Sequence, residues 1–438
     1  MTDTFFSKKN YFEVTIYYLI ILLPITLVSG PFLPDLSVTI ITLFFLYISF
    51  KKKLFFYYQN KFSKIFGLFF IILLITSFFS LNPEISFKKS IVFFRFWIFS
   101  LAVWYIFSIK KKIIDHLIIS FSFVFIILII DGYIQFIFKE NIFGWPMQGS
   151  RLSSLFKDEL ILGSYLSRLL PLFFGFLIFT NFNKKIYKFI LFFLIFVGVE
   201  TLTFLSGERV AFFFINASSI MLILTMRNFK LFRITSVTVS ILLIIFLINF
   251  NPKSTERIFD KTISQLGFNE NTAVTTESKT NASKDKTVSK KYIFSVEYEN
   301  HYISSFRMFK DNIITGIGPR MFRYTCIQKE YNLWEGCSTH PHNTYIQLLA
   351  ETGLIGFILG VAIFIIIFSS IIKHFIYKYF KNKILFSDFQ LCLLSAILIS
   401  IWPFIPTGDF FNNWLNIIYF FPVGFYLNTI YPSKGSVI

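Results

Sequence analysis

The chain alternates long apolar runs with short polar connections along most of its length. About twelve of the runs are long enough to cross about 30 Å of hydrocarbon as helices. They cover residues 11–29, 33–50, 65–81, 91–108, 113–138, 159–180, 186–205, 209–226, 232–250, 345–372, 385–404 and 412–430. The pattern therefore predicts an all-α polytopic membrane protein with about twelve transmembrane helices.

Lysine and arginine are concentrated in every second connection between these runs. The basic groups are Lys51–Lys53, Lys110–Lys112, Lys184–Lys185, Arg227–Arg233 and Lys373–Lys383. Such residues are enriched on the cytoplasmic side of membrane proteins, so we expect both termini and these loops to face the cytoplasm. The net charge of +18 then reflects membrane topology, and no nucleic-acid partner is expected.

One connection on the opposite, outer face is large and divides the chain into three parts. These are residues 1–250 with nine helices, the large loop 251–344, and residues 345–438 with three helices. Within the loop, Ser254–Phe268 is expected to form a short surface helix, and the spaced aromatic residues of Tyr292–Lys310 suit a helix lying on the interface. Between them, Asn269–Lys291 is nearly devoid of apolar residues, and we expect it to be disordered.

The end of this loop, Ser338–Gly356, begins polar and continues into an apolar helical pattern. Pro341 suits the first position of a helix, which places His340 near the N-cap and His342 in the first turn. A helix N-terminus disfavours positive charge and attracts anions, so it would keep His342 neutral and able to accept a proton. The alternative is that both histidines only cap a helix at the membrane surface.

Small residues recur on the helix face that starts at His342. At about 100° per residue, this face carries His342, Ile346, Leu349, Gly353, Gly356 and Gly360. Glycines at such a spacing allow a neighbouring transmembrane helix to approach closely. Glu351 lies on roughly the opposite face, where we expect it to have a separate, supporting role.

Positively charged residues also occur on the outer face, against the usual distribution of charge. They are Lys88, Lys89, Arg95, Arg151, Arg168, Arg209, Arg307, Arg320 and Arg323. Guanidinium groups bind phosphate oxygens in bidentate fashion, so the cluster predicts a site for the diphosphate head group of a lipid. Alternatively, Arg95 and Arg168 pair with nearby acids or extend to the interface, and Arg209 pairs with Glu208. The loop arginines could also contact anionic lipids without selectivity.

Two cysteines, Cys326 and Cys337, lie in the outer loop just before the histidines. An oxidising periplasm permits a disulfide between them, which would hold the approach to His342 in place; the alternative is two unpaired thiols. Cys392 lies inside an apolar run and is expected to be a small apolar filler.

Familiar motifs for nucleotide and metal binding are missing from the sequence. It contains no phosphate-binding glycine loop, no paired-cysteine zinc spacing and no His-Glu-x-x-His helix. We therefore predict no metal and no cofactor, and the energy for any reaction would come from the substrate itself.

Three segments resemble one membrane family. The segment His342–Gly356 reads His, Asn, nine residues, Gly, two residues, Gly, and it resembles the O-antigen ligase signature. Ser206–Arg209 resembles the family's Ser/Thr-x-x-Arg segment, and Ser305–Gly318 resembles the stretch that leads into the second half of its large periplasmic loop. The number of helices and the place of the large loop also match the family layout.

The resemblance implies an inverting glycosyltransferase of the GT-C-like membrane type, in the bacterial inner membrane with its active site on the periplasmic side. Such enzymes act in lipopolysaccharide biosynthesis, where they transfer a glycan from undecaprenyl diphosphate to lipid A–core without metal or nucleotide. Alternatives are an O-antigen polymerase, which uses a second lipid-linked chain as acceptor, and a protein O-oligosaccharyltransferase. A transporter is less consistent with the sequence, because the polar residues gather at one face rather than at the midplane.

The resemblance also implies roles for individual residues. His342 would be the general base on the acceptor hydroxyl, and Arg209 and Arg307 would hold the donor diphosphate. Further substrate contacts are expected from Lys88, Lys89, Arg95, Arg151, Arg320, His340 and Asn343. Structural roles are expected for Cys326, Cys337, Glu351, Gly353 and Gly356.

Overall fold

The structure is a computed structural model that describes residues 11–180, 182, 186–249, 256, 258, 296–333 and 336–432. In these residues the regular structure is helical, with two isolated β-bridges in the connection near residues 140–151. Asn269–Lys291 and nearly all of Ser254–Phe268 lie outside the described residues, so the predictions for those two segments are not addressed.

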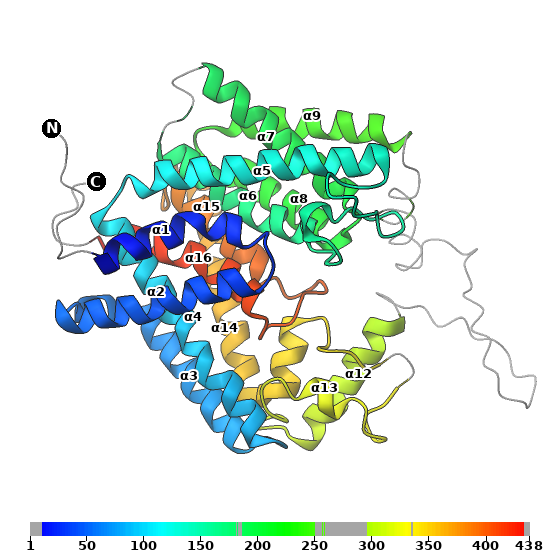
Figure 1. The fold of residues 1–438 in the computed structure, drawn as a ribbon. Helices are drawn as coiled ribbons and strands as arrows, with labels where there is room; N and C mark the ends of the chain where they lie inside the picture. The colour runs from blue at the N-terminus through cyan, green and yellow to red at the C-terminus, as the bar shows by residue number, and fades with distance from the viewer. Residues whose placement is uncertain are drawn as a thin grey trace, which may run out of the picture.

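Each predicted apolar run contains one helix within the described residues (Figure 1). These are α1 (Tyr11–Thr26), α2 (Phe32–Lys51), α3 (Lys61–Phe78), α4 (Pro83–Ile109), α5 (Ile113–Phe138), α6 (Leu162–Phe179), α7 (Ile186–Leu205), α8 (Arg209–Thr225), α9 (Lys230–Ile248), α14 (Thr344–Phe380), α15 (Asp388–Ser400) and α16 (Asn413–Ile430). The outer segment adds α12 (Val296–Asp311) and the short α13 (Phe322–Thr325), and two 3₁₀ turns are η1 (Phe55–Tyr58) and η2 (Ser154–Phe156).

Length and composition allow eight helices of the described part to cross a membrane. They are α2, α3, α4, α5, α6, α7, α9 and α14, whereas α1, α8 and α15 are apolar but shorter. The structure therefore supports a multi-pass membrane protein without establishing the predicted number of twelve spans. Helix α15 ends at Ser400, before the predicted boundary at 404, because Pro403 cannot continue a helix.

The helices form one bundle in which α1, α2, α4 and α16 lie between two groups (Figure 1). One group contains α5 to α9 with α15, and the other contains α3, α14 and the outer helices α12 and α13. The apolar core runs along α4, α6, α15 and α16, whose buried side chains include Trp104, Phe173 and Phe421. In a membrane, close van der Waals packing of these side chains, rather than their removal from water, is a main favourable contribution to the bundle's core.

Alternate connections meet at the same end of the bundle, as the distribution of charge predicts. At one end, Lys378 donates to the backbone carbonyl of Met226 (2.7 Å), and Asp388 accepts the backbone N–H of Arg227 (2.9 Å). These contacts join the basic α8–α9 and α14–α15 connections. At the opposite end, the Trp414 indole donates to the Leu27 carbonyl (2.8 Å), which joins the α15–α16 and α1–α2 connections.

The start of α14 corrects two expectations. The N-cap is Asn343 rather than a residue near His340, and its side chain accepts the N–H groups of Tyr345 (2.9 Å) and Ile346 (3.1 Å). His342 therefore lies outside the helix, with a backbone φ of 56°. Asparagine is the better cap because its side-chain oxygen accepts N–H groups of the first helical turn that have no partner within the helix, whereas the side chain of proline has no acceptor.

The predicted continuous span 345–372 is wrong as well, because α14 breaks at Gly353 (φ 64°, ψ −163°). The rings of Tyr345 and Phe364 lie 6.4 Å apart between centroids, although residues 19 positions apart in a straight helix are about 28 Å apart. The two parts, 344–352 and 354–380, therefore fold back against each other. The glycines were expected to let a neighbouring helix approach, but Gly353 instead allows α14 itself to bend.

The turn after α12 packs its backbone against this break. The Leu354 N–H donates to the Ile313 carbonyl (2.8 Å), and the Ile317 N–H donates to the Ala350 carbonyl (2.9 Å). A Cβ on Gly353 would lie 2.2 Å from the Ile314 carbonyl oxygen. Glycine is required here because the two backbone segments cross at hydrogen-bonding distance and leave no room for a side chain. The crossing also gives hydrogen-bond partners to backbone groups that the break in the helix leaves unpaired.

Replacing Gly353 by alanine should lower the stability of the folded protein. The glycine has a backbone conformation that costs other residues about 1–3 kcal/mol, and the added methyl group also meets the Ile314 carbonyl. We expect a lower melting temperature in detergent and less protein in the membrane. Gly67→Ala in α3 is the matched control, because a Cβ there meets no atom within 4 Å. An unchanged melting temperature for Gly353→Ala would contradict the crossing.

Candidate active site

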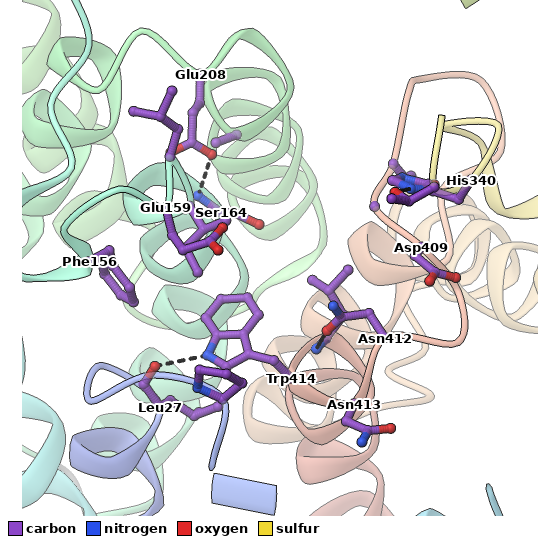
Figure 2. Close-up of a pocket in the computed structure, with 18 of the residues that line it drawn as sticks. Leu27, Phe156, Glu159, Ser164, Glu208, His340, Asp409, Asn412, Asn413 and Trp414 are labelled. Atoms are coloured by element: carbon purple, nitrogen blue, oxygen red, sulfur yellow. Dashed lines mark hydrogen bonds between the residues drawn. The ribbon is translucent and has the colours of Figure 1, made fainter. Parts of the chain in front are cut away.

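A cavity of about 1200 Å³ lies at the end of the bundle where the non-basic connections meet. Its walls come from parts of the chain that are far apart in sequence (Figure 2). One wall carries Phe156, Glu159, Ser164 and Glu208; the facing wall carries His340 and Asp409, and Asn412, Asn413 and Trp414 lie between them. The α1–α2, α5–α6 and α15–α16 connections, with the starts of α6 and α8, therefore form a single site.

Two histidines, His340 and His342, line one side of this cavity, and His301 of α12 packs against His342. The ring of His342 lies 4.1 Å from that of His340 and 5.3 Å from that of His301, measured between centroids. The Tyr298 ring is 5.2 Å from His342 on the α12 side. Among the described residues, no group of His, Cys, Asp or Glu side chains is arranged to hold a metal ion. The cluster is therefore an arrangement of imidazoles whose proton affinities influence one another.

Burial keeps His342 neutral. Together with the neighbouring His340 and His301, burial lowers the pKa of His342 to about 3. The sequence pattern predicts the same charge state from a different cause, the N-terminus of a helix to which His342 does not belong. A neutral imidazole in a cavity can accept a proton from a substrate hydroxyl.

The loop that carries His342 is fixed by the α15–α16 connection. The Thr407 N–H donates to the His342 carbonyl (2.7 Å), and the Thr407 hydroxyl accepts the N–H of Thr344 (2.9 Å). The Asn343 side chain also donates to the carbonyl of Pro403 (2.8 Å). These bonds hold the left-handed backbone of His342 and present its ring to the cavity.

The predicted disulfide between Cys326 and Cys337 is present. It joins the end of α13 to the segment that continues to His340, so Arg323 and the histidine loop are tied together. Cys392 is a buried free thiol in contact range of Gly175, which agrees with the expected role as a small apolar filler.

Arg168 lies on the opposite wall and is nearly fully buried, with 3% of its surface exposed. Its guanidinium lies 4.8 Å from the centroid of the Phe214 ring, and it donates to Ser164. Within the described residues no carboxylate lies within 4.0 Å of it, and its Nε has no hydrogen-bond partner. A buried positive charge without a counter-ion is costly, so this side chain is suited to bind an anionic ligand.

Glu208 occupies the start of α6 on the same wall. Its carboxylate accepts the backbone N–H groups of Gly163 (2.7 Å) and Ser164 (3.0 Å). Burial raises the pKa of this carboxyl to about 7, against the opposing charges of Arg151 and Arg168. This side of the cavity therefore contains two arginines together with Asp158, Glu159 and a Glu208 carboxyl whose raised pKa reduces its negative charge.

Three further cations line the side nearest the histidines. Lys89 donates to the Asn413 side chain (2.8 Å), and Arg323 forms an ion pair with Asp409 (3.2 Å). Arg320 also lines the cavity. Of the substrate-contact residues predicted from the sequence, His340, Lys89, Arg151 and Arg320 line the cavity together with His342.

Other predicted residues lie outside the lining. Arg95 is bound to Asp35 through two hydrogen bonds (2.7 and 3.0 Å), and Lys88 pairs with Glu84 on the surface. Arg307 is exposed on α12 and donates to the Glu330 carbonyl (3.2 Å).

Two of the predicted residues lie beside the cavity rather than in it. Arg209 begins α8 between Glu208 and Val210, both of which line the cavity. Glu351 is buried behind the site and accepts the Phe322 N–H (2.9 Å) and the Gln347 amide (3.0 Å). Glu351 therefore connects the start of α13 to the first part of α14.

Sequence reasoning missed several residues that belong to the site. His301 lies on α12, and the only signal for it was its position three residues after Tyr298, on the same helix face. Asp409 and Thr407 come from a connection without a recognisable motif. Glu208 was considered only as a partner for Arg209, whereas it caps α6.

Comparison with known families identifies the region that contains the histidine cluster. Residues 190–361 match a family model described as O-antigen ligase. No curated protein matches the chain. The matched residues run from α7 past the bend of α14 and include Glu208, His301, His340 and His342. This part of the chain is therefore similar to the O-antigen ligase family, whose members are glycosyltransferase-like enzymes that transfer lipid-linked glycans.

Proposed function

We propose that this protein is an O-antigen ligase, which transfers a glycan from undecaprenyl diphosphate to lipid A–core with inversion at the sugar carbon. The reaction would take place at the periplasmic face of the bacterial inner membrane. One observation carries the proposal: a half-buried neutral histidine, His342, lines the same cavity as Arg168, a buried arginine that has no carboxylate partner among the described residues. The pair suits a general base and a group that binds the leaving anion.

The donor diphosphate is assigned to the wall formed by α6 and α8. Arg168 and Arg151 supply guanidinium groups there, and these bind phosphate oxygens in bidentate fashion. Arg209, next to lining residues, is included as a further cation of this wall. Arg307, the other arginine suggested by resemblance, is exposed, so Arg168 is the stronger candidate for the main contact.

The chemistry follows from this placement. The acceptor hydroxyl oxygen attacks the sugar carbon that carries the diphosphate, while His342 takes the hydroxyl proton. The bond between that carbon and the phosphate oxygen breaks, and its electron pair leaves with the lipid diphosphate. Arginine charges placed at the leaving oxygens stabilise the negative charge that develops there. Attack from the side opposite the leaving group inverts the configuration.

Deleting the gene and analysing the lipopolysaccharide tests the proposal. Loss of a ligase leaves bare lipid A–core, with finished glycan stranded on undecaprenyl diphosphate. Loss of a polymerase would instead leave lipid A–core that carries a single repeat unit. Unchanged lipopolysaccharide with loss of glycans from proteins would identify a protein oligosaccharyltransferase. Either of the last two results would overturn the ligase assignment.

A further inference from the structure

His342 is well placed to take a proton but poorly suited to keep it. Burial and the neighbouring His340 and His301 together lower its pKa to about 3, and a base with a higher affinity for the proton assists a reaction more. The protonated ring would also face two other histidines, His301 and His340. A second group that accepts the proton would remove this disadvantage.

His340 is the neighbouring group with the closest ring, 4.1 Å away between centroids. Its side chain is buried, with 9% of the residue exposed, and it lines the cavity. Its Nδ1 is paired with the Thr339 hydroxyl (3.0 Å), and its buried Nε2 makes no hydrogen bond of normal geometry. The nearby Thr407 backbone favours the protonated ring, so a proton on this imidazole has an acceptor close by.

The charges around His340 come from four separate elements. Burial lowers the pKa of His340. Asp409 of the α15–α16 connection and the Thr407 backbone oppose this by favouring the protonated form, whereas Arg323 of α13 and His301 of α12 disfavour it further; His342 belongs to its own loop. Asp409 is held firmly, because it accepts the Gln347 amide (2.7 Å) and the Phe411 N–H (2.9 Å) and pairs with Arg323. A fixed negative charge next to His340 stabilises a proton on that ring.

Building on the proposed function, we propose that His340 and Asp409 form a proton-accepting pair behind His342. The proton leaves the acceptor hydroxyl for His342 as the new glycosidic bond forms, and it then passes to His340, where the Asp409 carboxylate stabilises it. It returns to water once the product has left. His340 and Asp409 act through His342, so they are positioning residues in this scheme.

The pH dependence of kcat separates this role from a structural one. Activity falls in acid because the histidine pair is protonated before the substrate reacts. Asp409→Asn removes a negative charge. The acid limb of the plot of kcat against pH should therefore move to lower pH by about one unit, and the maximal kcat should fall. Arg323→Gln removes a positive charge from the same ion pair, so its acid limb should move to higher pH.

Purified full-length protein in detergent, saturated with lipid-linked donor, is suitable for the measurement. Opposite shifts of the acid limb in the two variants support the proposal. Both variants break the same ion pair, so a purely structural effect would shift the two acid limbs equally or leave both unshifted. Asp409→Glu keeps the charge and should restore the native limb. If Asp409→Asn fails to accumulate, His340→Gln replaces it, with a lower kcat and a displaced acid limb expected.

Failure of this proposal can be distinguished from failure of the proposed function. Unshifted limbs in active Asp409→Asn and Arg323→Gln enzymes would overturn the proton-accepting pair and leave His342 as the base. An active enzyme that lacks the His342 imidazole would overturn both. Equal shifts in the same direction would also reject the pair, since they cannot arise from charges of opposite sign.

Discussion

Replacing His342 by asparagine should abolish glycan transfer while the protein still folds and accumulates in the membrane. Asparagine is chosen because His342 has a φ of 56°, a conformation that asparagine adopts more readily than other non-glycine residues. Loss of a general base reduces rates by about 10²–10⁴-fold, and the release of lipid diphosphate from a lipid-linked donor measures this directly. His342→Ala should be equally inactive but less stable, because alanine is strained at this φ.

A histidine far from the cavity provides the matched control. His116 lies in α5, bonds Tyr17 and does not line the active-site cavity, so His116→Asn should leave the turnover of a folded enzyme unchanged. Normal surface polysaccharide in cells that carry His342→Asn would contradict the role of base. Equal losses in both variants would show that the assay reports general damage rather than chemistry.

The arrangement of helices could be predicted well because it depends on local properties. Apolar length and the position of lysine clusters are read within one segment, and the helices occur where those patterns place them. The bend at Gly353 could not be read in this way. It exists because the Ile313–Gly318 backbone packs against it, and the two segments are more than 30 positions apart in the chain.

The start of α14 shows how two local rules can compete. Pro341 and Asn343 both qualify as start signals, and the pattern alone does not rank them. In the structure the disulfide at Cys337 and the bonds from Thr407 hold the chain before Asn343 in a non-helical path. Long-range contacts therefore decide where the helix begins and leave His342 just outside it.

The cavity was predicted in part for a related reason. Histidines and arginines are conspicuous when their surroundings are apolar, and His342, His340 and Arg151 do line the site. Asp409 is an ordinary acid in the sequence, and its importance follows from contacts with Gln347 and Arg323. Residues whose role is created by distant partners carry no signal in a single sequence.

Arg168→Gln should remove most activity without reducing the stability of the ligand-free protein. The guanidinium is buried, and no carboxylate in the described part of the chain pairs with it, so its charge is a cost to folding that a bound anion would offset. Removing a group that stabilises developing negative charge costs about 10²–10³-fold in rate. The expected signature is thus a large loss of donor turnover together with an equal or higher melting temperature.

Inorganic diphosphate provides an independent reading of the same site. It should raise the melting temperature of the native protein, because ligand binding to the folded state stabilises it, and it should have little effect on Arg168→Gln. Arg168→Lys keeps the charge but loses the two-pronged contact, so an intermediate loss of turnover is expected.

Comparison with Arg307→Gln tests which arginine binds the leaving diphosphate. Arg307 is exposed and donates to a backbone carbonyl, whereas Arg168 is buried in the cavity lining, so a ligand gains more by binding Arg168. A greater loss of turnover in Arg307→Gln than in Arg168→Gln would move the diphosphate to the α12 side. If Arg168→Gln were also less stable than the native protein, Arg168 would be a structural residue. A ligand-binding arginine is expected to lower activity when it is replaced and to leave the stability of the ligand-free fold unchanged or higher.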